Sequence, residues 1–168
     1  MRSLLVGLPL LAAAAVLQST VLPAFRVLAG GGPDLVLVLA LSWTLAGGWE
    51  SGVSWGFFGG LCLDLLSGGP LGAAALAGVL MTALASLTEG QFWRSHVLLP
   101  LAVSLLGSVG FHLVQFALLA GAGVALDWGQ ALAGILLPST LLNTLCVLPV
   151  YQLMRGLHGL VFPLAVKR

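Results

Sequence analysis

Charged side chains are scarce in this sequence. Only 7% of its 168 residues are Asp, Glu, Lys or Arg, whereas 60% are hydrophobic. Soluble domains carry about 25% charged residues, so this chain has too few to cover the surface of a water-soluble enzyme. The formal net charge of +1 gives no sign of nucleic-acid binding, and the high hydrophobicity excludes intrinsic disorder. The composition therefore predicts a polytopic membrane protein.

Cysteine is also rare, and the common catalytic motifs are absent. Cys62 and Cys146 lie in separate apolar runs and are expected to behave as small hydrophobes. There is no CxxC pair and no closely spaced His/Cys cluster, so no metal or other cofactor is predicted. HExxH, GxSxG and P-loop sequences are missing. Ser108 and His112 have the spacing of a nucleophile and its base, but no acid is placed to orient the histidine, so we expect no enzyme.

The hydrophobic runs predict an all-α membrane protein, a compact bundle of six transmembrane helices in a single domain. A helix needs about 20 residues to cross the hydrocarbon core, so a chain of this length accommodates about six. The second and third runs are short, and they are either two thin helices of a hairpin or include one re-entrant segment. The predicted spans are residues 3–22, 35–48, 51–66, 71–87, 97–119 and 130–154, with a cytoplasmic tail over 155–168 that lies along the membrane surface.

The basic residues orient these spans. Cytoplasmic segments of membrane proteins carry an excess of Lys and Arg. With both termini in the cytoplasm, five of the six basic residues lie inside and only Arg26 lies outside, which agrees with this rule. An odd number of spans would divide the basic termini between the two sides. The cytoplasmic set serves topology alone or also contacts anionic lipid or a partner; it comprises Arg2, Arg94, Arg155, Lys167 and Arg168.

Glycines recur at every fourth position through the third predicted span. Positions four apart share one helix face, and bare backbone there lets another helix approach closely. This face either docks a partner's helix or packs within the bundle, and internal packing is favoured. A Gly56→Leu change is therefore expected to disrupt folding or assembly. The series comprises Gly48, Gly52, Gly56 and Gly60, and Asp64 follows at the same spacing.

Asp64 is the acid that we expect within the apolar layer, about one turn from the outer end of its span. Charges are costly inside a bilayer and are retained for function or satisfied locally. Asp64 therefore either contacts a ligand or partner, or bonds to the backbone of 67–69 or to water as a helix-end residue. An Asp64→Asn change distinguishes the two, because only the first interpretation predicts impaired function.

A polar stripe runs along the fifth predicted span. Ser104, Ser108 and His112 follow one another at intervals of four, and Gln115 lies three residues further on. Lipid offers no hydrogen-bond partners, so the stripe is expected to face the interior. Asn143 in the sixth span is expected to bond across to another helix. These groups either hold helices together, which is favoured, or line a substrate cavity.

Several of these residues, taken together, resemble the MreD family of rod shape-determining proteins. The resemblance lies in a Pro-Asp-Leu sequence before the second span, spaced glycines, and a block that joins glycines, an acid and a proline in fixed order. It covers about 40 residues, and the remainder agrees in hydropathy only. The matching segments are 33–38, Gly48, Gly52 and 56–72, together with 17–19 and Asn143.

The resemblance implies a non-enzymatic component of the bacterial cell-elongation machinery in the inner membrane. The implied partners are MreC, MreB, RodA and the penicillin-binding transpeptidase that works with RodA. The family is also similar in fold to the S components of energy-coupling-factor transporters, which dock a coupling protein through small residues of the first helix. That analogy makes the run from Ala12 to Ala15 a candidate docking face. The alternative function is a vitamin- or metabolite-binding transport subunit with the polar stripe and Asn143 in its pocket.

Overall fold

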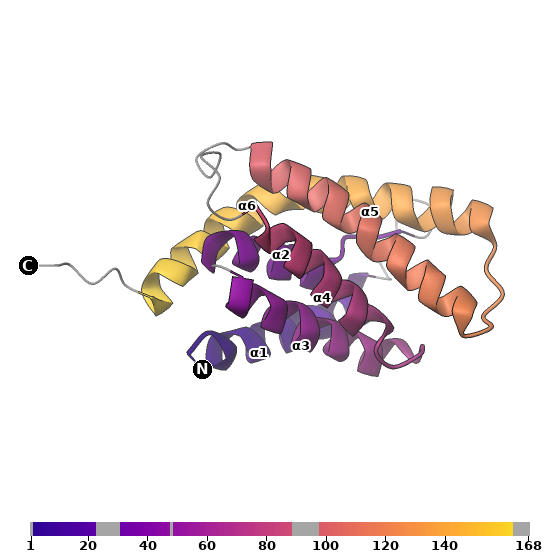
Figure 1. The fold of residues 1–168 in the computed structure, drawn as a ribbon, viewed down its shortest axis with the longest axis horizontal. Coiled ribbons are helices and arrows are strands. Elements are labelled where there is room, and N and C mark those ends of the chain that lie inside the picture. The colour runs from indigo at the N-terminus through magenta and orange to yellow at the C-terminus, as the bar shows by residue number, and fades with distance from the viewer. Residues whose placement is uncertain (1, 23–30, 48, 89–97, 163–168) are drawn as a thin grey trace, which may run out of the picture.

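A computed structural model describes residues 2–22, 31–47, 49–88 and 98–162 of the chain (Figure 1). These described residues form six α-helices and no β-strand, as the hydrophobic runs predict. Two short π-helical segments adjoin the helices: η1 (Leu17–Val21) extends the first and η4 (Gln130–Leu136) leads into the last. The α-helices are α1 (Arg2–Val16), α2 (Leu35–Gly47), α3 (Trp49–Ser67), α4 (Ala73–Ser86), α5 (Leu98–Gly121) and α6 (Leu137–Val161).

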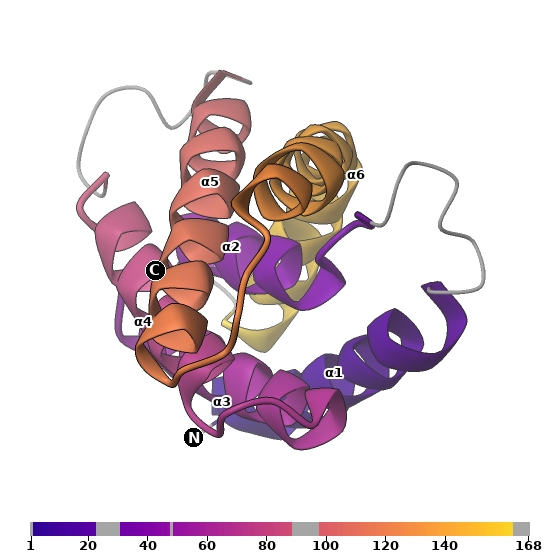
Figure 2. The ribbon, with the colours of Figure 1, turned by 90° about the vertical axis from the view of Figure 1, so that its right-hand side faces the viewer.

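Helix α2 forms the centre of the bundle. Every residue from 36 to 45 is buried, and Figure 2 shows the other helices arranged around it. A helix that is apolar on all sides is typical of a protein core or a membrane span, and here other helices enclose it. Its 13 residues span roughly 20 Å, which is less than the hydrocarbon core of about 30 Å. The second and third apolar runs form two separate helices, α2 and α3. Trp43 and Trp55 stack between them with ring centroids 4.2 Å apart.

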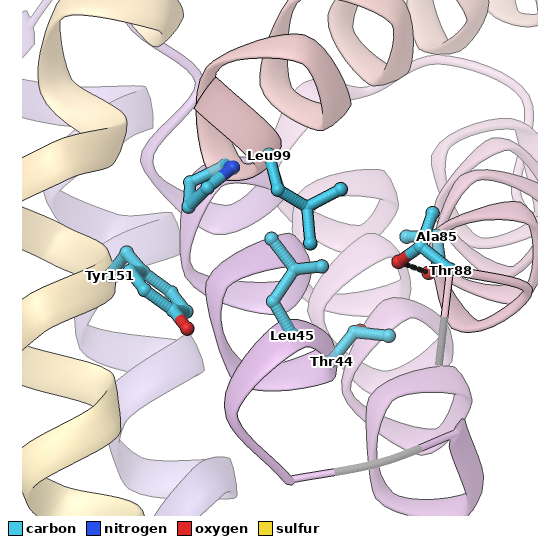
Figure 3. A pocket seen from close by; sticks show the side chains of 7 residues that line it. Thr44, Leu45, Ala85, Thr88, Leu99 and Tyr151 are labelled. Atoms are coloured by element: carbon cyan, nitrogen blue, oxygen red, sulfur yellow. Dashed lines mark hydrogen bonds between the residues drawn. The ribbon is translucent and has the colours of Figure 1, made fainter. Parts of the chain in front are cut away.

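The helices run alternately in opposite directions. Residues late in α2, α4 and α6 meet the beginning of α5 around a cavity of about 10 Å³, which is room for one water molecule at most (Figure 3). The starts of α1 and α3 also meet, since Trp55 Nε1 donates to Ser3 Oγ at 3.3 Å. We call the end of the bundle at which α1 begins the N-terminal end. The side chains labelled in Figure 3 are Thr44, Leu45, Ala85, Thr88, Leu99 and Tyr151.

Three stretches of the described chain are long and apolar enough to cross a membrane. They are Ser3–Val21, Leu98–Gly121 and Gln130–Val161, and two shorter apolar helices, Leu35–Gly47 and Ala73–Ser86, lie among them. Each of the six predicted spans overlaps one helix of the structure.

The last helix is longer than the sequence predicts. We expected a span that ends at Met154 and a tail from Arg155, whereas α6 continues without a break to Val161. The continuation has a packing reason. Leu157 and Val161 lie against the core that α1, α2 and α3 form, and the ring of His158 meets Trp43 edge-on at 5.2 Å.

Candidate functional site

Buried polar side chains from several helices converge on Asp34, which immediately precedes α2. Asn143 of α6 lies at the middle and has no exposed surface. Its Oδ1 accepts from the backbone N–H of Asp34 at 2.6 Å, and its Nδ2 donates to Asp34 Oδ2 and to Ser108 Oγ, both at 2.9 Å. One amide thus ties the start of α2 to α5 and α6. We call Gln18, Asp34, Ser108, His112 and Asn143 the polar centre.

Gln18 of η1 explains why the carboxylate of Asp34 is available to this centre. An aspartate before a helix usually caps the first free N–H groups of that helix. Here the backbone N–H of Val36 instead donates to Gln18 Oε1 at 3.2 Å, while Gln18 Nε2 donates to Asp34 Oδ1 at 3.2 Å. A residue of the first span therefore caps α2, and the Asp34 side chain turns toward α5 and α6.

His112 of α5 completes the polar centre. Its Nδ1 lies 2.8 Å from the backbone oxygen of Ser108, and its Nε2 lies 3.4 Å from Asp34 Oδ2. The histidine thus contacts the serine carbonyl and not the hydroxyl. Ser108 Oγ accepts from Asn143, so Ser108 and His112 do not form the nucleophile and base that their spacing allowed us to consider.

A cleft of about 270 Å³ opens onto the polar centre. Gln18, Asp34 and His112 form part of its polar lining, and Gln115, which also lines it, makes no hydrogen bond to another described residue. Both π-helical segments border the cleft, which is a common association of such segments with functional sites. The other polar lining residue is Ser139, which accepts from the N–H of Gly32 at 3.2 Å. The apolar walls are Leu22, Phe116, Leu119 and Ile135.

The structure brings together four of the five predicted interior polar residues. Ser108, His112 and Asn143 meet in the polar centre, and Gln115 lines the cleft above them. Ser104 is fully buried one turn away along α5, and its hydroxyl has no hydrogen-bond partner.

Sequence reasoning missed Asp34. It was not among the candidate site residues, and it entered only as part of the segment 33–38 that carries the family resemblance. His112 in the fifth span could have indicated this role for Asp34, because a histidine in an apolar interior needs a polar partner.

Asp64 has a structural partner within the chain. It is 3% exposed, and its carboxylate accepts from three backbone N–H groups at the start of α4. Oδ1 accepts from Ala74 at 2.8 Å, and Oδ2 accepts from Gly72 and Ala75 at 2.9 and 3.1 Å. The expected bonds to the backbone of 67–69 are not those that the carboxylate makes. An acid at a helix N-terminus satisfies free donors and the helix dipole, so α3 supplies the cap of α4.

The glycines of α3 face neighbouring helices of the same chain. A methyl group on Gly56 would lie 2.6 Å from the backbone oxygen of Gly78, and one on Gly60 would collide with the backbone of Ala74 and Ala75 in α4. Gly52 lies against Thr44 of α2. Gly48 lies outside the described residues. The described part of this glycine face is therefore covered within the bundle.

The small residues of α1 point in two directions. Ala15 is fully buried beside Leu11, whereas Ala12 is exposed. The outward face of α1 carries Leu5, Leu8, Ala12 and Val16, and we call these four residues the α1 face. In Figure 2 α1 lies at the edge of the bundle beside α3, which leaves this face without a neighbouring helix of the described chain.

The described residues contain no group of three or more His, Cys, Asp or Glu side chains that could hold a metal ion. In comparisons with known proteins, no curated protein and no solved structure matches the chain. The family model of the rod shape-determining protein MreD matches residues 1–158. That match covers nearly all of the 168 residues, and the chain therefore belongs to the MreD family.

Proposed function

We propose that this protein is a non-enzymatic scaffold of the cell-elongation machinery in the bacterial inner membrane, and that it binds MreC. Membership of the MreD family carries this proposal, because it makes the chain a membrane component of the system that determines rod shape. The hydrogen bonds of the polar centre support it. Asn143 and Ser108 hold α5 and α6 to the start of α2 through these bonds, which is a structural role.

The binding surface for MreC is the α1 face. Leu5 and Val16 are 75% and 49% exposed, and Ala12 lies between them with a side chain small enough for a second helix to approach closely. The opposite side of α1 packs into the core through Leu11 and Ala15. The glycine face of α3 is already occupied by α4, which favours α1 over α3 as the seam for a membrane helix of the partner.

The scaffold lies in the membrane with both termini in the cytoplasm. Arg2 and Arg155 belong to helix segments at the N-terminal end of the bundle. This supports the N-terminal end as the basic, cytoplasmic side. Arg94, Lys167 and Arg168 lie outside the described residues. In this orientation the N-terminal end faces MreB and anionic lipid, the cleft faces outward, and RodA with its transpeptidase partner is positioned beside the complex.

Cysteine crosslinking tests the α1 face. In a chain that carries Cys62→Ala and Cys146→Ala, an Ala12→Cys residue should form a disulfide with a cysteine placed in the membrane helix of MreC. Leu145→Cys is the matched control, because Leu145 is also a membrane-facing residue and is 74% exposed on α6. Crosslinking at position 145 but not at position 12, in a complex that still forms, would contradict the α1 face while leaving MreC binding intact.

A transport subunit similar to S components is the second candidate, and the cleft is the observation that favours it. Its volume of about 270 Å³ is close to the lower limit of small-molecule sites. Purification of the tagged protein from its native membrane in mild detergent, followed by mass spectrometry, separates the two functions. Recovery of MreC supports the scaffold, whereas recovery of a coupling protein with paired ATPases and no MreC refutes it.

A further inference from the structure

We propose that Asp34 and His112 together bind one proton, which they exchange through the cleft with the outer side of the membrane. The site consists of the 3.4 Å contact between His112 Nε2 and Asp34 Oδ2, at the floor of the cleft. It does not depend on the binding of MreC or any other partner.

The hydrogen bond of His112 Nδ1 indicates which ring nitrogen carries a hydrogen. The backbone oxygen of Ser108 can only accept, and it lies 2.8 Å from His112 Nδ1, so Nδ1 carries a hydrogen. A neutral imidazole with its hydrogen on Nδ1 has a lone pair on Nε2. That lone pair would then face Asp34 Oδ2 at 3.4 Å.

A lone pair and an ionised carboxylate repel each other, most strongly in an apolar interior. One proton between Nε2 and Oδ2 removes the repulsion in either of two ways. The ring is protonated and pairs with the carboxylate, or the carboxylic acid donates to the neutral ring. Both arrangements have the same total charge, so the proton belongs to the pair.

The surroundings of the pair also require this proton. The side chains that face it from η1, α5 and α6 are neutral and do not titrate: Gln18, Ser108, Gln115, Ser139 and Asn143. His112 also packs between the rings of Phe111 and Phe116. Among the described residues, His112 is the one basic side chain within ion-pair distance of Asp34. Loss of the proton would leave an unpaired negative charge in an apolar interior, which is costly.

A carboxyl group fits the bonds at this position in both arrangements of the proton. Oδ2 of a carboxylic acid can accept from Asn143 Nδ2 and donate to His112 Nε2 at the same time. An amide atom in the same place either accepts or donates. Aspartic acid at position 34 therefore suits a bound proton better than asparagine, which has the same shape.

The cleft connects the site to the outside. The side chain of Asp34 is 14% exposed and that of His112 is 4% exposed, so the carboxylate is the group that water in the cleft reaches first.

Nuclear magnetic resonance of the full chain in lipid bilayers, with ¹⁵N-labelled histidine, tests the proposal. A His112→Gln variant assigns the signal among the three histidines. We expect the ¹⁵N spectrum at pH 7 to show a proton on His112 Nδ1. The shared proton should then appear in one of two places, either on His112 Nε2 in the same spectrum or as an Asp34 carboxylic acid in the infrared spectrum. An Nε2 without a proton beside an ionised carboxylate at pH 7 would overturn the proposal. This readout on the unchanged protein does not depend on any variant folding.

Two variants sharpen the result. Asp34→Asn should leave the ring with a proton on Nδ1 alone and abolish any carboxylic acid band assigned to this position. His158→Gln is the control, because His158 contacts Trp43 far from the cleft and the His112 signals should not change. Filling the cleft with Gln115→Trp should slow exchange of the shared proton with D2O several-fold. An unchanged exchange rate would refute the route through the cleft.

Discussion

The side chain of Asn143 makes three hydrogen bonds in the polar centre. It satisfies the backbone N–H and the carboxylate of Asp34 as well as the hydroxyl of Ser108. The amide is buried at the point where α6 passes α5 and the start of α2, so its loss leaves groups on two other segments without partners. Asn143 therefore connects α6 to α5 and to the start of α2.

An Asn143→Ala substitution should lower the free energy of unfolding by about 1–3 kcal/mol, because buried polar groups lose their partners. The loss is measured as a lower melting temperature of the purified protein in detergent. Gln152→Ala is the matched control, since Gln152 is an exposed amide on the same helix. Equal melting temperatures for the two variants would contradict the role of Asn143.

Asp64 makes a separate prediction at the same scale. Asp64→Ala removes the acceptor of three N–H groups and should cost about 1–2 kcal/mol, as other helix caps do. Asp64→Asn keeps one acceptor oxygen and should have a smaller effect. Asp127→Ala serves for comparison, because Asp127 caps the last helix from an exposed position through Gly129 and Gln130. If Asp64→Asn folds normally but fails to support rod shape, Asp64 has a role beyond the cap.

At the scale of elements, the contact between α3 and α4 depends on the absence of side chains. Gly56 and Gly60 meet the backbone of α4 directly, whereas Gly156 on α6 has open space around it. Close backbone approach of this kind is a common way to pack helices in membranes. Glycines with the same helical conformation therefore differ in what a methyl group would meet.

Gly60→Ala should destabilise the bundle, because the backbone of Ala74 and Ala75 must move to admit the methyl group. Gly156→Ala should be neutral or should stabilise α6 by up to about 1 kcal/mol, since alanine favours helix. Thermal unfolding of both variants in detergent measures the difference. A Gly60→Ala protein as stable as the Gly156→Ala protein would show that α3 and α4 are not closely packed.

Helix positions were predictable from the sequence, but not all helix ends. The long apolar runs predicted the positions of α1 and α5, and the two short runs predicted those of α2 and α3, where the structure has helices. The predicted sixth span ends at Met154, whereas the helix itself continues to Val161. Burial of Leu157 and Val161 against a core built by other helices extends the helix, and no local pattern records that contact.

At the scale of the whole molecule, alternate helix directions place the start of α1 and the end of α6 at the same end of the bundle. The N-terminal end collects the starts of α1, α3 and α5 and the ends of α2, α4 and α6, as the residues of Figure 3 show for four of them. The basic residues of the sequence favour the cytoplasm for that side.

Reporter fusions test this orientation. Alkaline phosphatase joined after Arg168 should be inactive and green fluorescent protein at the same place should fluoresce, because we propose a cytoplasmic C-terminus. Phosphatase inserted in the exposed turn at residues 122–125 should be active. Active phosphatase at the C-terminus would contradict the cytoplasmic location proposed for that end of the chain.

The sequence by itself determined that this is a helical membrane protein of the MreD family. Charge content and the length of the apolar runs predict a helical membrane protein, because lipid imposes these local constraints on any chain. The ordered block around Gly56 and Asp64 carries the resemblance to the family. The family match over residues 1–158 confirms the resemblance. The fold similarity to S components stays a prediction.

Only the tertiary structure decided what the polar residues do. Gln18 caps a helix that starts 17 residues later, and Asp64 caps α4 from another helix. Asp34 meets His112 and Asn143, which lie far along the chain. Hydrogen bonds in a membrane interior must be satisfied by whichever helix is adjacent, and adjacency follows from how α2 is enclosed, which composition and periodicity do not encode.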